Sequence, residues 1–481
     1  MKQKDFVINL IFLLVLNLLI KPFWLLGVDV GVQVSVGAEQ YGAYFAIFNF
    51  TYLFNMLLDM GVNNFNNRNI AQHRQLLTKH LSGILTLKLS LGLVYLSAVF
   101  IVGFIIGYRD FQLKILFWTA INQFLNSLIL YLRTNISALF MFKTDSFLSI
   151  LDRLIAIIIC STLLWGNVTD QPFRIEWFIY SQTAAYMISA IVAFAILLTK
   201  ASPIKLHWSL PFARMILKKS LPFAILYLLM SFYNRIDSVM LERMLPGTAG
   251  DYETGIYASA YRLLDALVQI AYLFSVILLP LFSRMLKEKS NLTPIIKTSF
   301  SLLVFFSVTS TVILLFYRLP VLQFLYADHC HESAQVFQFL IPCIIPISFT
   351  YIFGTLLTAN GNMRLLNITS IAGICVNLAV NLILIPRLHA VGAAIASLST
   401  QSVVATIQIF IISKQLNFSL KILPWMRSVA FCLLLIIAAY FTYNYLAINP
   451  LLAIVLLGIS AFVFAMISGL FSIKEIIALR R

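Results

Sequence analysis

The sequence predicts an all-α polytopic membrane protein with about 14 transmembrane helices. Three observations support this prediction. The 481 residues are 61% hydrophobic and only 11% charged, and their mean hydropathy is +0.93. Apolar stretches of helix-spanning length recur along the whole chain, and lysine and arginine gather in alternate connections between them. A soluble domain of this size could not bury so much apolar surface, so the composition excludes a water-soluble globular protein.

Each apolar stretch is long enough to cross a hydrocarbon core of about 30 Å as a helix. The first lies near the N-terminus, but it is too long for a signal peptide and lacks a small-residue cleavage site, so we predict that it is a membrane span. The predicted spans are 6–27, 42–62, 81–107, 113–137, 145–165, 176–199, 220–242, 256–282, 293–317, 334–359, 365–385, 391–413, 424–445 and 449–471.

The distribution of basic residues predicts the orientation of these spans. The chain has 34 Lys and Arg against 18 Asp and Glu, a net charge of +16. Of the basic residues in connections, 21 lie on the side of the N-terminus and 5 on the other. The positive-inside rule therefore places both termini in the cytoplasm. Anionic lipid headgroups account for the basic character, so no nucleic-acid partner is expected.

An internal repeat relates the two halves of the chain. The segment EQYGAYFAIFNFTYLFNML at 39–57 aligns with YETGIYASAYRLLDALVQI at 252–270, so that Gly42 matches Gly255 and Tyr44 matches Tyr257. Six spans separate the copies, which predicts parallel, pseudo-symmetric bundles around a central cavity. We expect one six-helix bundle at 1–205, a second at 206–415, and two additional helices with a cytoplasmic tail at 416–481.

Three cations lie deep inside predicted spans. A rise of about 1.5 Å per residue places Lys21 and Arg235 about 22 Å from the cytoplasmic edge of the membrane, and Arg262 about 9 Å from the outer edge. An ionised group at such depth faces a wet cavity or a partner. Cations gathered at one level suggest an anionic ligand, although structural ion pairs remain an alternative.

Polar residues share helix faces with these cations. Asn17 lies four residues before Lys21, and Gln269 continues the stripe of Arg262 and Asp265. Arg262 and Asp265 could also neutralise each other. The predicted substrate-binding residues are Lys21, Arg235, Arg262, Asn17 and Gln269, and the candidates for a coupling-ion site are Asp237, Asp265 and Asp59.

The sequence lacks the motifs of an energy-coupled or metal-dependent enzyme. It has no G-x-x-x-x-G-K-[ST] loop for ATP and no H-E-x-x-H or zinc-type cysteine cluster. We expect no catalytic residue, no metal and no cofactor other than coupled H⁺ or Na⁺. The connection ADHCHES at 327–333 is interpreted as a short polar loop rather than a metal site.

Four passages resemble bacterial oligosaccharide flippases of the multidrug/oligosaccharidyl-lipid/polysaccharide exporter superfamily, in particular the O-antigen and capsule repeat-unit translocases. The passages are LLDMGVNNFNNRNIAQH (57–73), YNRIDSVML (233–241), GIYASAYRLLDAL (255–267) and LILIPRLHAVGAAIAS (382–397). The resemblance implies alternating access in a V-shaped pair of bundles, with cavity cations holding a diphosphate. Lys21, Arg235 and Arg262 match that role by position.

The resemblance implies a protein of the bacterial inner membrane that flips a polyprenyl-diphosphate-linked oligosaccharide to the outer leaflet for lipopolysaccharide O-antigen or capsule assembly. A downstream polysaccharide polymerase is then an expected partner. Two alternatives stay open at this point. One is a cation-coupled multidrug antiporter of the same superfamily, which would favour an acidic, aromatic cavity. The other is a membrane glycan polymerase or acyltransferase, which would need a positioned acid, base or metal.

Overall fold

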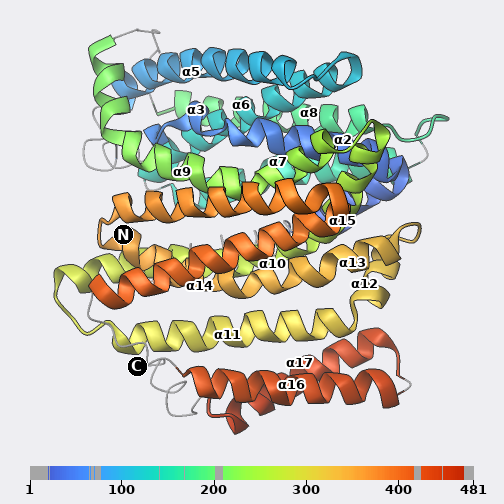
Figure 1. Cartoon of the computed structure of the whole chain (residues 1–481). Coiled ribbons are helices and arrows are strands. Elements are labelled where there is room, and N and C mark those ends of the chain that lie inside the picture. The colour runs from blue at the N-terminus through green and yellow to red at the C-terminus, as the bar shows by residue number, and fades with distance from the viewer. Residues whose placement is uncertain are drawn as a thin grey trace. The chain divides into compact units, whose positions relative to one another are not determined.

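Helices make up the regular secondary structure of the described part of the chain (Figure 1). The computed structural model describes residues 20, 22–63, 66, 70, 77–139, 141–166, 168–200, 210–415, 424–446 and 448–470. The all-helical prediction is confirmed. Its physical reason is that a bilayer offers no water to backbone N–H and C=O groups, so each apolar stretch must satisfy them within a helix.

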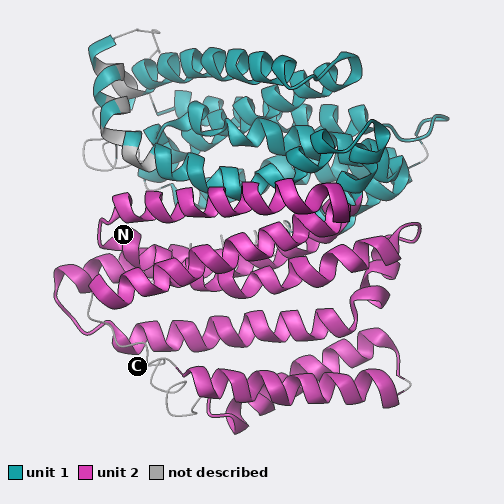
Figure 2. Cartoon of the chain, viewed as in Figure 1, with its two compact units in different colours: residues 1–255 teal, residues 256–481 magenta. Residues whose placement is uncertain are grey.

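Contacts divide the chain into two compact units, residues 1–255 and 256–481, coloured separately in Figure 2. The division falls inside helix α10, beyond the predicted bundle boundary at residue 205, and helix α9 packs on α2 within unit 1. The elements that begin in unit 1 are η1 (Trp24–Asp29), α2 (Val30–Leu53), α3 (Met56–Asp59), α5 (Leu77–Ile105), α6 (Asp110–Ala138), α7 (Phe142–Trp165), α8 (Ile175–Leu198), α9 (Leu210–Met244) and α10 (Thr248–Lys287).

Unit 2 contains most of α10 and all later elements. Within it α14 packs on α15, and α11 packs on both α14 and the C-terminal helices α16 and α17. The later elements are α11 (Thr293–Phe316), α12 (Arg318–Leu325), α13 (Cys330–Leu340), η3 (Ile341–Cys343), α14 (Ile344–Ala359), α15 (Met363–Gln415), α16 (Trp425–Tyr445) and α17 (Pro450–Ile467).

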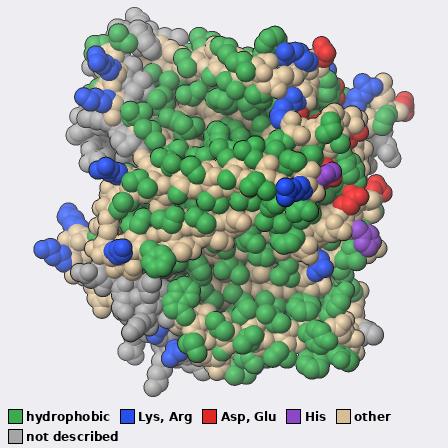
Figure 3. Space-filling view, in the orientation of Figure 1, with side chains coloured by type: hydrophobic (Ala, Val, Ile, Leu, Met, Phe, Trp, Pro, Cys, Tyr) green, Lys and Arg blue, Asp and Glu red, His purple; other side chains and the backbone are tan. Residues whose placement is uncertain are grey.

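The helices account for the predicted spans. Ten of the described helices are long and apolar enough to cross a membrane. Helix α15 covers two predicted spans, and α9 covers the seventh. Helix α2 covers only residues 42–53 of the second predicted span, 42–62, because it begins at Val30 and ends at Leu53, and the short helix α3 follows. Polar residues lower the hydropathy of α2 and α9. The first predicted span, 6–27, lies mostly outside the described residues. In each unit, hydrophobic side chains cover the middle of the helices and charged side chains gather near their ends (Figure 3).

The turn between the eleventh and twelfth predicted spans is tighter than the sequence suggests. Helical backbone runs through α15 except at His389, where φ is 51° and ψ is −127°. A Cβ atom on Gly392 would lie 2.6 Å from the backbone carbonyl group of Leu384. The chain therefore reverses within a few residues, and glycine is needed where the two arms meet.

The repeated glycines Gly42 and Gly255 contact each other's helices within unit 1. A Cβ atom on Gly42 would lie 1.8 Å from the backbone oxygen of Asp251, and one on Gly255 would lie 2.0 Å from that of Ala38. The Gln33 side chain donates a hydrogen bond to the Gly255 carbonyl oxygen at 2.9 Å. The two glycines thus allow α2 and the first turns of α10 to pack backbone against backbone.

Candidate functional site

Arg235 lies on the face of α9 that packs against α2. Its guanidinium donates a hydrogen bond from Nη1 to Oδ1 of Asn49 at 3.4 Å. Its Cζ atom lies 5.3 Å from the ring centroid of Tyr52, within cation–π range. The hydroxyl of Tyr52 lies 2.9 Å from that of Tyr227, which is eight residues before Arg235 on α9. The amide of Asn49 and the ring of Tyr52 therefore hold the guanidinium in place. Arg235 is only half-buried, so part of its side chain stays accessible.

Asp237 occupies a different environment from Arg235. Two residues along a helix point about 200° apart, so the sequence predicts that the two groups do not share a face. Asp237 is only 1% exposed, whereas Arg235 is half-buried. Ser231, one helical turn before Arg235, is buried as well. The candidate coupling residue Asp237 is thus more enclosed than the candidate substrate-binding cation.

A cavity of about 370 Å³ opens in unit 1 between α3, α6 and α9. Tyr227, which hydrogen bonds to Tyr52 beneath Arg235, forms part of its wall. The wall is rich in amide and hydroxyl groups, and one carboxylate reaches it. Its polar lining residues are Asn55, Asp59, Asn63, Asn126, Ser127 and Tyr227. Such a set of hydrogen-bond donors and acceptors, together with the apolar lining residues, suits a ligand that carries hydroxyl groups.

Asp59 is held at the edge of this cavity by a buried lysine. Lys88 on α5 is 2% exposed, and its ammonium lies 2.8 Å from Oδ1 of Asp59. The same Nζ donates to the backbone oxygen of Leu58 at 2.9 Å and to the hydroxyl of Ser127 at 3.1 Å. All three N–H donors of the ammonium therefore have acceptors. Asp59 is 34% exposed, so the second carboxylate oxygen has access to solvent or ligand.

We predict that the two partners of this ion pair differ in their effect on stability. Asp59→Asn leaves the buried ammonium of Lys88 without its counter-charge and should destabilise the protein by about 3–5 kcal/mol. Lys88→Met leaves a carboxylate that water can reach, so its effect should be smaller. The double variant Lys88→Met/Asp59→Asn should recover part of the loss. Thermal unfolding of the detergent-solubilised variants measures this order, and equal loss in both single variants would contradict it.

A second charged cluster in unit 1 includes a residue that the sequence analysis missed. Asp29 is buried at the end of η1 and accepts a hydrogen bond from the Tyr41 hydroxyl at 2.9 Å. Arg153 on α7 lies close enough to Asp29 to interact with it electrostatically, and its Cζ lies 5.2 Å from the Trp24 ring. The sequence feature that could have identified Asp29 is its position as the single carboxylate in the apolar run WLLGVDVGV at 24–32.

In unit 2 the predicted stripe on α10 begins with a paired cation. Arg262 is 7% exposed, and its Nη1 lies 3.8 Å from Oδ2 of Asp265. This distance is that of a loose ion pair rather than a hydrogen bond. Arg262 and Asp265 therefore partly neutralise each other, which is one of the two possibilities that the sequence allowed. Farther along the helix Gln269 is exposed, and Tyr272 packs edge-on against Tyr351 at 6.0 Å. Exposure along the stripe therefore increases from the buried, charged Arg262 to the exposed, polar Gln269.

Lys21 and Asn17 lie outside the described residues. Arg235 belongs to the first compact unit and Arg262 to the second. The roles of all predicted substrate-binding and coupling residues therefore stay predictions.

The connection before α13 contains a buried imidazole. His329 packs on the ring of Tyr326 at 5.6 Å, and its Nε2 lies 3.2 Å from the hydroxyl of Ser259. Burial lowers the pKa of His329, so the neutral imidazole is favoured near neutral pH. In the part of the chain that the structure describes, no three His, Cys, Asp or Glu side chains are placed to share a metal ion.

Comparisons with known proteins are consistent with this helical architecture. A search of curated proteins finds no match. The lipid II flippase MurJ in an inward closed conformation has 14% sequence identity and a TM-score of 0.73, over 97% of this chain and 98% of that one. An inward-facing MATE multidrug resistance transporter of the MOP superfamily has 13% identity and a TM-score of 0.60, over 84% and 99% of the two chains.

A MOP superfamily transporter from Pyrococcus furiosus, described as having a binding pocket of reverse polarity, also has 13% identity and a TM-score of 0.60, over 85% of this chain and 95% of that one. At these identities the likenesses show a shared fold and no shared substrate. The profile of one family, described as Polysaccharide biosynthesis protein, matches residues 6–286. That match covers more than half of a multi-pass membrane chain with the MOP-type transporter fold, and the chain therefore belongs to the polysaccharide biosynthesis protein family.

Proposed function

We propose that this protein flips a polyprenyl-diphosphate-linked oligosaccharide from the inner to the outer leaflet of the bacterial cytoplasmic membrane by alternating access. Membership of the polysaccharide biosynthesis family and the flippase-type fold support a transporter in glycan assembly. In this proposal both termini are cytoplasmic, and the exported glycan is an O-antigen or capsule repeat unit that a downstream polymerase elongates.

The observation that carries the proposal is the environment of Arg235. A guanidinium inside a membrane span is retained only where a polar partner or ligand stabilises it. Here an amide and an aromatic ring position it, and its planar fork of N–H donors matches phosphate oxygens in a bidentate manner. Lys21 and Arg262 are proposed as further substrate-binding cations, with Asn17 and Gln269 as neutral hydrogen-bonding neighbours. Arg262 would exchange its loose contact with Asp265 for a phosphate oxygen.

The cavity beside Asp59 is proposed to accommodate sugar hydroxyls. Its amide, hydroxyl and carboxylate groups offer both donors and acceptors, as a carbohydrate requires. Lys88 satisfies one oxygen of Asp59 and leaves the other accessible to a ligand hydroxyl. The hydrocarbon tail of the substrate would stay in lipid, because moving it into a polar cavity would lose its apolar contacts.

Without ATP, net transport of the oligosaccharide in one direction requires coupling to an ion gradient, to the membrane potential or to removal of the product. We propose that an acidic residue inside the membrane, Asp237, Asp265 or Asp59, takes up H⁺ or Na⁺ during the cycle. The three differ in burial, and Asp237 is the most enclosed.

The test is transfer of a lipid-linked oligosaccharide in proteoliposomes. The purified protein is reconstituted with the substrate in the inner leaflet, and the fraction accessible to an added membrane-impermeant glycosidase is followed with time. We expect protein-dependent transfer that needs no ATP and increases with an imposed ion gradient. Transfer equal to that of protein-free liposomes would contradict the proposal.

The multidrug antiporter is retained as a second candidate because MATE transporters share the fold. A fluorescent organic cation in the same proteoliposomes separates the two functions, since an antiporter should move the dye against a proton or sodium gradient. Formation of polymer or acylated product by the purified protein would instead indicate a membrane glycan polymerase or acyltransferase.

A further inference from the structure

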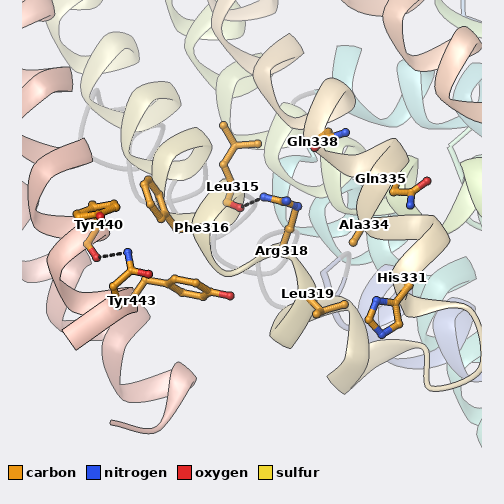
Figure 4. Close-up of a pocket in the computed structure, with 11 residues that line it drawn as sticks. Leu315, Phe316, Arg318, Leu319, His331, Ala334, Gln335, Gln338, Tyr440 and Tyr443 are labelled. Carbon is orange, nitrogen blue, oxygen red and sulfur yellow. Dashed lines mark hydrogen bonds between the residues drawn. The ribbon is translucent and has the colours of Figure 1, made fainter. Parts of the chain in front are cut away.

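A cavity of about 550 Å³ lies within unit 2, away from the residues assigned above (Figure 4). It is lined by the end of α11, by α12 and α13, and by the last turns of α16. Its volume is in the range of small-molecule sites. The residues that line it are Leu315, Phe316, Arg318, Leu319, His331, Ala334, Gln335, Gln338, Tyr440, Tyr443 and Asn444.

Specific aromatic packing shapes this cavity. Tyr317, which follows α11, is buried, and its ring packs edge-on against that of Tyr443 on α16 at 5.5 Å. The ring of Phe316 lies 6.3 Å from that of Tyr443. These contacts join the end of α16 to the turn between α11 and α12. Helix α16, the first of the two additional C-terminal helices, therefore supplies one wall of the cavity.

The polar part of the wall favours an anion. Arg318 donates one hydrogen bond, from Nη1 to the Leu315 carbonyl oxygen at 2.9 Å, which positions a guanidinium that has five N–H donors (Figure 4). The amides of Gln335 and Gln338 and the imidazole of His331 offer further donors. None of the eleven described lining residues is acidic, although Asp328 lies in the connection before α13 and Glu332 in the first turn of α13.

The apolar part of the wall favours a ligand with a hydrocarbon portion. Leu315, Phe316 and Leu319 line the same cavity as Arg318. The end of α16 exposes Tyr440, Phe441 and Tyr445, and exposed aromatic residues at a helix end are typical of the level of lipid headgroups. Next to them, apolar side chains along α16 such as Ile437 are also exposed and can contact an acyl or prenyl chain.

We propose that this cavity binds the phosphate headgroup of a lipid, with Arg318 as the main contact to the phosphate and α16 as the surface for the hydrocarbon chain. The charge distribution predicts that these helix ends are on the outer side of the membrane. A glycerophospholipid and a polyprenyl phosphate share this chemistry, and either can supply the ligand. The proposal does not depend on the flippase function, because it concerns only binding.

The test is binding of fluorescently labelled lipids to the purified full-length protein in detergent. The probes are phosphatidylglycerol, a polyprenyl phosphate and, as the neutral comparison, diacylglycerol. We expect one or both phosphate lipids to bind more tightly than diacylglycerol, and the tighter of the two identifies the source. Arg318→Gln should weaken that binding about tenfold or more, because a charge-assisted contact is lost, and Arg318→Lys should recover part of it.

Two further variants make the test specific. Gln335→Trp fills the cavity from an exposed lining position and should weaken binding without removing charge. Arg174→Gln removes an exposed arginine from another connection and should leave binding unchanged. Size-exclusion profiles and unfolding temperatures confirm that each variant is folded. Equal binding of diacylglycerol, or unchanged binding by folded Arg318→Gln and Gln335→Trp, would overturn the proposal.

Discussion

Replacement of Arg235 by alanine is expected to abolish glycan export by cells that depend on this protein. Alanine removes the only group in this part of α9 that can offer a bidentate, permanently charged fork to a diphosphate. It also leaves the amide of Asn49 and the ring of Tyr52 without the cation that they hold. Arg235→Lys should retain part of the activity, because lysine keeps the positive charge but offers a point charge in place of the fork.

The measurement is the amount of surface glycan at equal membrane levels of each variant. Arg284→Ala is the matched control, since Arg284 is an exposed arginine on α10 that pairs with Glu288 one turn later. An exposed pair of this kind contributes little, so export should be unchanged. Full export by Arg235→Ala at normal protein levels would remove Arg235 from the substrate site.

Substitution of Gly42 or Gly255 by valine is expected to prevent correct folding of unit 1. The Cβ atom of either residue would lie about 2 Å from a backbone oxygen of the other segment, so the clash cannot be relieved by moving a side chain. Overpacking of a core usually costs about 1–3 kcal/mol. We expect a larger loss here, because α2 and the start of α10 must separate and the hydrogen bond from Gln33 to Gly255 must lengthen.

Fluorescence-detected size-exclusion chromatography of tagged variants measures this effect. Gly42→Val and Gly255→Val should lose the monodisperse peak, and Gly42→Ala should be impaired as well. Gly458 on α17 is a suitable control because a Cβ atom there meets no atom within 4 Å. Gly458→Val should keep the wild-type profile, and wild-type profiles for the other variants would show that the close approach is not required.

The sequence by itself determined the helical class and the approximate spans. An uninterrupted apolar stretch of about 20 residues has few alternatives in a bilayer, where every backbone hydrogen bond must be made within the helix. The sequence also singled out Gly42 and Gly255 as a repeated pair. It did not indicate that the two glycines contact each other's helices, because alignment relates positions and not distances.

The tertiary structure decided which charged groups pair and which remain accessible. Lys88 lies within the predicted span 81–107, and the structure shows that it is buried and contacts Asp59, about 30 residues away in the chain. Arg262 contacts Asp265 on its own helix, whereas Arg235 contacts α2, far away in sequence. Hydropathy and helical periodicity are local properties, but the free energy of a charge in a membrane depends on its neighbours in space. For that reason the sequence could identify the charged residues of this protein, and only the packing of its helices could assign their partners.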